Sequence, residues 1–553
     1  MPAEGVFTWL GILVLVTSAC QGPDDSPSAE PSAAGDVSVA GPDSPPPTVG
    51  EISDCPGLAV VMVDGLQRYV DSFGEVTGPE IADLALERQD DLDQLTTEVR
   101  AKAEELGCAA PTMTPLLEQE LRRLHGDGPI QTAIANTFRS DPLGTIDPAD
   151  PGPTTRSVST SEDLAAALIT LGSGSTLRLE GGDFEVDEPL VIQRPLTIVG
   201  AGRSRTTLRS SATGAALVLV SDGNVRLADL GIAHVGAEPS SIVVVTAGGY
   251  EFADVLIQGA IADEDGAGGF GVVLRADSPL LASGTRQVIR DSSLRDNDSG
   301  GIVVAGSEAP IISSVRVSGT SGCGVCWAES AKGTISDSTI VGVETGVRIE
   351  GQAAPIILGT TIRSADTGVA ILGSGNPVLR HANLFGNGIG VSIAGSGRAS
   401  IVDNLISDSR LGIQVSGTSM AVLEDNEVAG GGDAGIAVIE RAAPALRGVL
   451  IAMDGEVGML WADHAGGRAA DVVVRGPRVG IQLSDDAAPL LSGVVVEDVG
   501  EVALFSAGRS GGDVRDLRCD DTDSALVLLL ERTAVEVDGS ENCRVVDERD
   551  APA

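Results

Sequence analysis

The chain has 553 residues and a mass of 56.0 kDa, with 79 acidic against 36 basic side chains, so its formal net charge is −43 at pH 7. A chain this acidic is repelled by phosphate and by anionic lipid, which excludes nucleic-acid binding and unaided attachment to a membrane. Hydrophobic residues make up 42% of the chain, and no Gly-x-y period runs through its 71 glycines, which excludes wholesale disorder and collagen.

The N-terminus reads as a targeting signal. Residues 7–19 are uncharged and too short to span a bilayer, which takes about 20 apolar residues, and they end in Thr17-Ser18-Ala19-Cys20. This ending resembles a bacterial lipobox, which implies that Cys20 becomes the lipidated first residue of an exported envelope protein. Thr17 stands where leucine is usual, and no basic residue precedes the apolar core. A plain secretory signal with an incidental cysteine is the alternative.

Residues 21–53 contain seven prolines, six acids and no basic residue. A segment of this composition cannot bury enough apolar surface to fold, so we predict an extended, disordered tether. The predicted order is therefore signal peptide (1–20), then tether, then folded domains.

Residues 54–145 show a helical period and predict a small α-helical domain. Leu58, Met62 and Leu66 follow an i, i+4 spacing, a second apolar stripe runs from about 79 to 106, and Thr114-Pro115 predicts the start of a third helix. Pro129 to Phe138 is a candidate fourth helix. No cluster of chemically reactive residues appears here, which favours a packing or docking module joined by a linker (146–157) to the rest.

Six cysteines remain once Cys20 is set aside, and an even number in an exported chain suggests disulfides. A Cys55–Cys108 bond would join the first helix to the end of the second, and Cys519 and Cys543 are about one repeat apart. Cys323-x-x-Cys326 could also be a redox pair or half a zinc site, although no second pair and no nearby histidine supports zinc. The disulfide candidates are Cys55, Cys108, Cys323, Cys326, Cys519 and Cys543.

A repeat of 22 to 23 residues organises the rest of the chain. Glycine followed by an apolar-x-apolar run begins each unit, and a second marker, proline before a short apolar run, keeps the same period. The glycines are Gly301, Gly324, Gly346, Gly368, Gly390, Gly412, Gly435, Gly458 and Gly480; the prolines are Pro310, Pro355, Pro377, Pro444 and Pro489. Short strands of this kind bury their apolar face only when successive coils stack in register.

The repeat resembles the right-handed parallel β-helix of the pectin-lyase-like superfamily. The fold class is therefore predicted to be mainly β, a right-handed parallel β-helix of about 22 residues per coil over residues 158–545, preceded by the small α-helical domain and followed by a tail (546–553). About 17 coils are expected, and we expect a monomer. Thr160-Ser161-Glu162-Asp163 before an apolar run predicts a capping helix over the N-terminal mouth.

The outward-facing row of the β-helix can be read two residues after each repeat start, and it contains no carboxylate. Five residues after the start, however, three successive coils carry Glu440, Asp463 and Asp485, with His464 beside them. Stacked carboxylates are candidate ligands for calcium or a candidate acid–base group. Trp461-Ala462-Asp463-His464 looks like a pectate-lyase signature. The Arg-x-Pro-x-x-Arg motif of that family is only partly present, as Arg475-Gly476-Pro477, with no arginine three residues after the proline. Solvated turn residues are the simpler interpretation.

Three functions follow from this pattern. We favour a surface-anchored, non-catalytic β-helix lipoprotein that binds glycan, envelope polymer or a cell-envelope protein through a long acidic face, with calcium as a candidate bridge. The alternative is a carbohydrate-active enzyme, polysaccharide lyase- or epimerase-like, that uses Glu440, Asp463, His464 and Asp485. The third is a structural spacer without a ligand.

Overall fold

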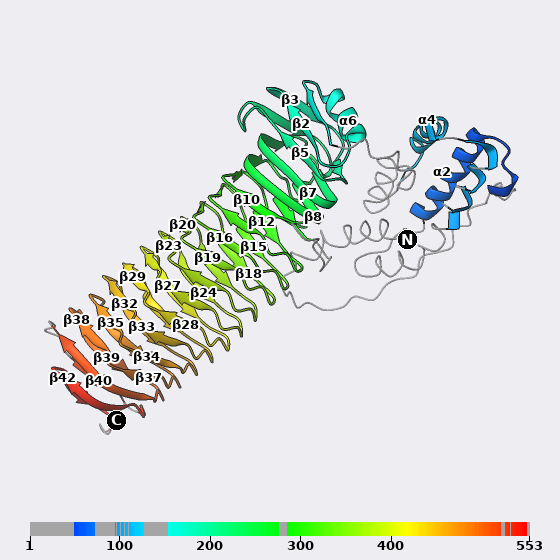
Figure 1. Cartoon of the computed structure of the whole chain (residues 1–553). Coiled ribbons are helices and arrows are strands. Elements are labelled where there is room, and N and C mark those ends of the chain that lie inside the picture. The colour runs from blue at the N-terminus through cyan, green and yellow to red at the C-terminus, as the bar shows by residue number, and fades with distance from the viewer. Residues whose placement is uncertain are drawn as a thin grey trace. The chain divides into compact units, whose positions relative to one another are not determined.

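The structure is a computed structural model and describes residues 49–71, most of 94–125, 153–275, 285–520, 526–530 and 532–549. Two compact units, Met1–Pro151 and Gly152–Ala553, make up the chain, and each is described by itself (Figure 1). The predicted signal with Cys20, most of the predicted tether and the candidate fourth helix lie outside the described residues. Among the helices described, none is long and apolar enough to cross a membrane.

The first unit contains η1 (Val49–Glu51), α2 (Cys55–Asp71) and α4 (Ala110–Leu121). The predicted apolar stripe of the first helix is confirmed, because Leu58, Met62 and Leu66 are buried in one cluster with Leu117 of α4. Burial of this stripe drives the two helices together, since most of the stability of a helix in a protein comes from the packing of its apolar face. The predicted disulfide joins Cys55 to Cys108, whose Cα atoms lie 5.7 Å apart.

The third predicted helix begins earlier than the sequence suggested. We expected it to open at Thr114-Pro115, but α4 starts at Ala110. Pro111 is the second residue of the helix, where the missing N–H would have no intrahelical partner in any case. Pro111 and Pro115 are each compatible with the start of a helix, and the prediction from Pro115 was wrong.

The second unit opens with α6 (Ser161–Thr170), which confirms the predicted capping helix. The N–H of Asp163 donates a hydrogen bond of 3.1 Å to Oγ1 of Thr160, the N-cap residue. Leu164 and Ala167 of α6 belong to the same buried cluster as the first coils. The helix thereby covers apolar side chains that an open end of the solenoid would expose.

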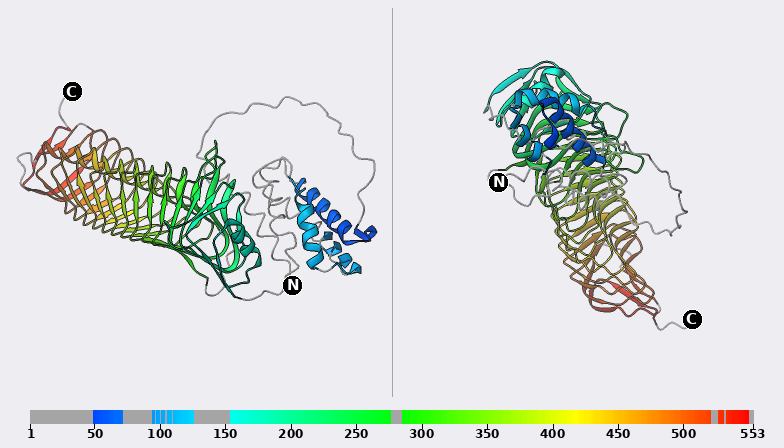
Figure 2. Two further views of the ribbon diagram at one scale, coloured as in Figure 1. Left: turned by 90° about the horizontal axis from the view of Figure 1, so that it is seen from above. Right: turned by 90° about the vertical axis from the view of Figure 1, so that its right-hand side faces the viewer.

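Parallel strands build the rest of this unit, and their coils stack into a rod (Figure 2). There are about 16 turns, close to the 17 expected. The first coils hold longer and less regular strands. They are β1 (Thr155–Val158), β2 (Ser175–Leu179), β3 (Gly182–Val186), β4 (Leu190–Ile192), β5 (Leu196–Val199), β6 (Thr206–Ser210), β7 (Gly214–His234), β8 (Ser240–Gln258), β9 (Phe270–Leu274), β10 (Gln287–Arg290) and β11 (Ser293–Arg295).

From residue 300 onward each coil contributes one strand to each of three sheets. Sheet 1 contains β12 (Gly300–Val304), β15 (Cys323–Trp327), β18 (Thr345–Ile349), β21 (Thr367–Ile371), β24 (Ile389–Ile393), β27 (Leu411–Val415), β30 (Ala434–Val438), β33 (Val457–Trp461), β36 (Val479–Leu483) and β39 (Val502–Ser506). Sheet 2 contains β13 (Ile311–Ser313), β16 (Thr334–Ser336), β19 (Ile356–Leu358), β22 (Val378–Arg380), β25 (Ser400–Val402), β28 (Val422–Glu424), β31 (Ala445–Arg447), β34 (Arg468–Ala470) and β37 (Leu490–Ser492).

Sheet 3 contains β14 (Arg316–Ser318), β17 (Thr339–Val341), β20 (Thr361–Arg363), β23 (Asn383–Phe385), β26 (Leu405–Ser407), β29 (Glu427–Gly430), β32 (Leu450–Met453), β35 (Val473–Arg475) and β38 (Val495–Glu497). The last coils hold β40 (Asp513–Asp520), β41 (Leu526–Leu529), β42 (Glu536–Glu541) and β43 (Arg544–Asp547).

The nine repeat glycines occupy the second position of the sheet-1 strands from β12 to β36, where successive coils approach most closely, and β39 has Ala503 there. A Cβ atom on Gly346 would lie 2.4 Å from the carbonyl oxygen of Gly368, one coil away. A Cβ on Gly390 would lie 2.6 Å from the carbonyl oxygen of Gly412. The glycine marker in the sequence is therefore a packing requirement of the stacked coils.

An internal ladder of asparagines supports the corner between sheets 2 and 3. Oδ1 of buried Asn404 accepts the N–H of Ala382 in the previous coil at 2.9 Å, and its Nδ2 donates to Oδ1 of Asn426 at 2.9 Å. The sequence places Asn297, Asn383, Asn387, Asn404 and Asn426 near turns and predicts an internal ladder of them. Asn426 is buried at the same corner as Asn404, and Asn297 and Asn387 are buried at the corner between sheets 3 and 1. Asn383 is not part of a ladder, because it is exposed at the start of β23, where the first residue of a sheet-3 strand points outward.

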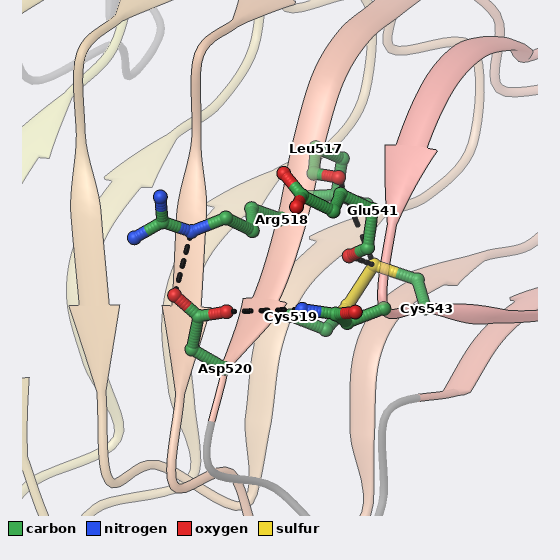
Figure 3. Close-up of a disulfide and its surroundings, with 7 residues drawn as sticks. Leu517, Arg518, Cys519, Asp520, Glu541 and Cys543 are labelled. Atoms are coloured by element: carbon green, nitrogen blue, oxygen red, sulfur yellow. Dashed lines mark hydrogen bonds and ion pairs between the residues drawn. A yellow bond between two sulfur atoms is a disulfide. The ribbon is translucent and has the colours of Figure 1, made fainter.

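The C-terminal coils are held by the second predicted disulfide. Cys519 of β40 and Cys543 have Cα atoms 5.3 Å apart, so a separation of 24 residues does place them on neighbouring coils (Figure 3). Asp520 lies beside this bond and pairs with Nε of Arg518 at 2.6 Å. Cys323 and Cys326 are joined to each other within β15, with Cα atoms 5.9 Å apart.

Candidate functional site

The three predicted carboxylates lie on successive coils at the corner between sheets 1 and 2. Each follows a sheet-1 strand by two residues, and the coils are linked by backbone hydrogen bonds such as that from His464 N to Glu440 O at 2.8 Å. Glu440, Asp463 and Asp485 all have left-handed backbone conformations, with φ of 62°, 59° and 57°. Other coils place glycine with positive φ at the equivalent position, for example Gly417 and Gly508.

Each of these carboxylates accepts a hydrogen bond from the backbone of the preceding coil. Glu440 Oε2 accepts from Gly417 N at 2.8 Å, Asp463 Oδ2 from Glu440 N at 2.9 Å, and Asp485 Oδ2 from Asp463 N at 3.3 Å. The row therefore satisfies N–H groups that a left-handed turn would otherwise leave to solvent. This structural role is sufficient to explain why acidic residues or glycines recur at the sheet 1–2 corner, and it requires no catalytic or metal-binding function.

His464 does not join these carboxylates. Its side chain is 67% exposed, and its Nε2 lies 3.8 Å from Asp486 Oδ2, which also pairs with Arg509 at 2.6 Å. In the part of the chain that the structure describes, no group of three or more His, Cys, Asp or Glu side chains is placed to hold a metal ion. The roles expected for Glu440, Asp463, His464 and Asp485 in calcium binding or catalysis stay predictions.

The outward row of sheet 1 has the register expected from the repeat. Cys326 pairs with Arg348, Arg348 with Ala370, and the row continues along the sheet to Gln482 without a carboxylate. A shallow recess of about 530 Å³ lies at the sheet 1–2 corner, lined by Leu372, Ser374, Ser396, Thr418 and neighbouring small residues, none of which titrates.

Acidic residues do form a line along the rod at the corner between sheets 2 and 3. This corner takes one left-handed residue per coil, which favours aspartate and glycine. The exposed aspartates of this line, which we call the Asp corner, are Asp291, Asp337, Asp403, Asp425, Asp471 and Asp516, with φ between 49° and 60°.

Two polar clusters in the early coils were not found from the sequence. Glu251 pairs with Arg226, Arg286 and Arg290 at 3.5, 3.1 and 3.0 Å. Burial raises the pKa of Glu251, but the hydrogen bonds from Arg290 and Arg286 outweigh burial, so its pKa lies below the usual range. The cluster joins strands β7, β8 and β10, and its side chains are far apart in the sequence, so no local pattern could reveal it.

The second cluster is enclosed in the core. The hydroxyl of Tyr250 donates to Glu308 Oε2 at 3.0 Å, and Gln287 Nε2 donates to the same oxygen at 2.6 Å. Burial raises the pKa of Tyr250 well above its ordinary value, and the charge of Glu308 raises it further. Tyr250 is fully buried and Glu308 is 2% exposed, so this cluster serves packing and is closed to a ligand.

A substitution series at Asp463 separates a turn residue from a reactive acid. Asp463→Gly should lower the free energy of unfolding by less than about 1 kcal/mol, because glycine suits the left-handed turn and only one exposed hydrogen bond is lost. Asp463→Val should cost about 2–3 kcal/mol, because a β-branched residue is strained there. Urea denaturation monitored by fluorescence measures both, and equal costs would contradict the turn role.

Comparison with known proteins supports the fold. A family model described as "Right handed beta helix region" matches residues 300–452. No curated protein matches the chain.

The solved structures to which the chain is similar include three at 13–14% identity. For the catalytic domain of a GH87 alpha-1,3-glucanase in complex with nigerose, the match covers 71% of this chain and 69% of that one, with 13% identity and a TM-score of 0.37. For an alginate lyase from Paenibacillus sp. it covers 56% and 99%, with 13% identity and a TM-score of 0.34. For the A-module of a mannuronan C-5 epimerase from Azotobacter vinelandii it covers 70% and 100%, with 14% identity and a TM-score of 0.37. Similarity at this level assigns no activity to the present chain.

Proposed function

We propose that this chain is a non-catalytic β-helix of the cell envelope, anchored through Cys20, that binds an extended glycan, an envelope polymer or a protein along its Asp corner. The proposal depends on a difference between the acidic residues at two corners of the solenoid. Those at the sheet 1–2 corner, Glu440, Asp463 and Asp485, are engaged by backbone N–H groups. Those of the Asp corner are exposed and recur along the rod, and two of them have side-chain partners, Asp291 with Arg290 at 2.9 Å and Asp403 with His381 at 3.6 Å.

A row of weak sites on a rigid rod binds a repeating ligand by multivalency. Once the ligand has bound to one coil, its contact with the next coil is effectively intramolecular. Several weak contacts therefore give a high overall affinity. The carboxylates attract amine-bearing ligands directly. Calcium would be needed to bridge them to an anionic polymer.

Chitosan is a suitable probe, because it is an extended glycan with amine groups. We expect the full chain to bind it in calorimetry, and the triple variant Asp403→Asn/Asp425→Asn/Asp471→Asn to bind about tenfold more weakly. The matched control removes the same charge elsewhere, at exposed acids for which the described residues show no side-chain ion pair. It is Glu344→Gln/Asp366→Asn/Asp454→Asn, all three at the corner between sheets 3 and 1.

The outcomes separate the candidate functions. Equal loss in both triple variants would mean attraction by net charge alone and would contradict a site at the Asp corner. No binding of chitosan, and none of alginate with calcium, would favour the structural spacer.

A further inference from the structure

The outward side of sheet 2 differs from the rest of this acidic surface. Each strand of three residues buries its middle side chain and points the first and third outward. The first-position row, from β13 to β37, is Ile311, Thr334, Ile356, Val378, Ser400, Val422, Ala445, Arg468 and Leu490. The third-position row is Ser313, Ser336, Leu358, Arg380, Val402, Glu424, Arg447, Ala470 and Ser492. We call these two rows the sheet-2 face.

Aliphatic side chains are exposed along this face. Of the ten exposed large hydrophobic side chains among the described residues, five lie here: Ile311 (55%), Ile356 (44%), Leu358 (38%), Val422 (37%) and Leu490 (57%). They are spaced along the face rather than contiguous, with Thr334 between Ile311 and Ile356, and with Ala445 and Arg468 between Val422 and Leu490. Half of the exposed large hydrophobic side chains on one face still favours an interaction there. The face carries no aromatic residue on which a sugar ring could stack, which favours a protein partner.

The net charge of the sheet-2 face is positive, whereas that of the chain is negative. It holds Arg380, Arg447 and Arg468 but only one acid, Glu424, and the described residues show no ion pair for any of these four. Elsewhere on the solenoid arginines such as Arg475 and Arg509 are paired with acids. A surface of net charge about +2 on a chain of −43 is where a second copy meets fewer opposing carboxylates than elsewhere.

We propose that two copies of this chain associate through their sheet-2 faces, with the rods antiparallel and the two-fold axis at the coil of β25. The strands β22 and β28 lie one coil on either side of β25, so the axis places Arg380 opposite Glu424 of the second copy, and Glu424 opposite Arg380. It also places Val378 opposite Val422, and Val402 opposite its own copy. Such reciprocity is what an isologous two-fold interface requires.

The match extends to the ends of the face. β13 and β37 lie four coils on either side of β25, so the two most exposed aliphatic residues of the face, Ile311 and Leu490, meet each other. A two-fold axis along the rod would instead set the first row against the third row of the same coil. Arg380 would then oppose Val378, and Glu424 would oppose Val422. The antiparallel arrangement therefore pairs Arg380 with Glu424 and Ile311 with Leu490, which the other axis does not. Its remaining arginines lie opposite uncharged side chains, Arg447 opposite Leu358 and Arg468 opposite Thr334.

The Asp corner borders this face and would lie at the rim of the interface. There Asp425 would oppose His381. Asp337 would oppose Asp471, and Asp403 would oppose its own copy, so these contacts are between like charges. Exposed rim charges of this kind contribute less than about 1 kcal/mol and are screened by salt. They lower the affinity of the pair without changing its register.

The size of the face predicts a modest affinity. Nine strands spaced about 4.8 Å apart and three residues wide give a surface roughly 40 Å by 10 Å, or about 400 Å² on each copy. A standard interface buries about 800 Å² on each partner. We therefore expect a dissociation constant in the micromolar range. The proposed dimer differs in this from the monomer expected from the sequence.

Charge reversal tests the register in solution. Sedimentation velocity of the full chain between about 1 and 100 µM should show a concentration-dependent dimer. Arg380→Glu and Glu424→Arg should each weaken it about tenfold or more, because each single change opposes like charges twice in the dimer. The double variant Arg380→Glu/Glu424→Arg restores both pairs and should regain most of the affinity. A chain that stays monomeric throughout, or a double variant weaker than both single variants, would overturn the proposal.

Cross-linking provides a second readout that does not depend on the charge variants folding. Facing sheets lie about 10 Å apart, which is too far for a direct disulfide but within reach of a short bis-maleimide. Val402→Cys should give a 402–402 cross-link that mass spectrometry identifies, and the unsubstituted chain controls for Cys20. Leu405→Cys, on sheet 3 of the same coil and 38% exposed, should give none. Cross-linking at 405 that equals that at 402 would refute the interface.

Discussion

Gly390→Ala should lower the free energy of unfolding by about 3 kcal/mol, a large fraction of the stability of an ordinary domain. The added Cβ would lie 2.4 Å from Cγ2 of Ile406 and 2.6 Å from the carbonyl oxygen of Gly412. The isoleucine can change its position slightly, but the carbonyl belongs to the backbone ladder of the next coil. Relief therefore requires two coils to separate, which weakens their hydrogen bonds as well.

Gly431→Ala is the matched control. No atom lies within 4 Å of a Cβ at Gly431, and its φ is not in the left-handed region. Its substitution should change stability by no more than about 0.5 kcal/mol in either direction. Guanidinium denaturation monitored by fluorescence reports on the solenoid through Trp327 and Trp461, both fully buried. Similar midpoints for Gly390→Ala and Gly431→Ala would show that the coils are not packed as closely as described.

Asn404→Ala should cost about 2–4 kcal/mol, because the amide side chain serves several buried groups at once. Oδ1 accepts from Ala382 N at 2.9 Å, and Nδ2 donates to Leu379 O at 3.1 Å and to Asn426 Oδ1 at 2.9 Å. Truncation leaves a backbone N–H and a backbone carbonyl without these partners inside the solenoid. The expected loss of stability therefore arises from buried polar groups that have no hydrogen-bond partner in the variant.

Asn376→Ala provides the comparison at an exposed site. Its Oδ1 accepts one bond, from Arg398 N at 3.0 Å, and water can replace it. We expect a cost below about 1 kcal/mol. The difference between the two variants, measured by the same denaturation, should be at least about 1 kcal/mol. If the two variants unfold at the same denaturant concentration, the internal ladder contributes nothing specific.

The sequence predicted the β-helix well because its determinants are periodic. A glycine every 22 or 23 residues reflects the close approach of coils, and alternating apolar residues set which side chains enter the core, so the register from Cys326 to Gln482 followed directly. The Cys519–Cys543 bond followed from the same period. The helical unit was less predictable, since a proline is accepted at several positions near a helix start and α4 begins at Ala110.

The surface was harder to predict than the core. The sequence shows that Glu440, Asp463 and Asp485 recur at one position, but their left-handed backbone and their bonds to the previous coil appear only in three dimensions. The apolar runs after the marker prolines read as buried strands. In the structure only the middle residue of each sheet-2 strand is buried, so Ile311 and Leu490 are left on the surface.

The most direct test is whether the chain cleaves or epimerises a polysaccharide or only binds it. The full chain, with calcium, should be incubated with alginate, α-1,3-glucan and chitosan, and the products followed by reducing-end assay, ultraviolet absorbance for unsaturated ends and NMR for epimerised residues. We expect the chain to bind chitosan and to produce no new ends and no epimerised residue. Product formation that disappears in the double variant Glu440→Gln/Asp463→Asn would contradict it and would make the sheet 1–2 corner a catalytic site.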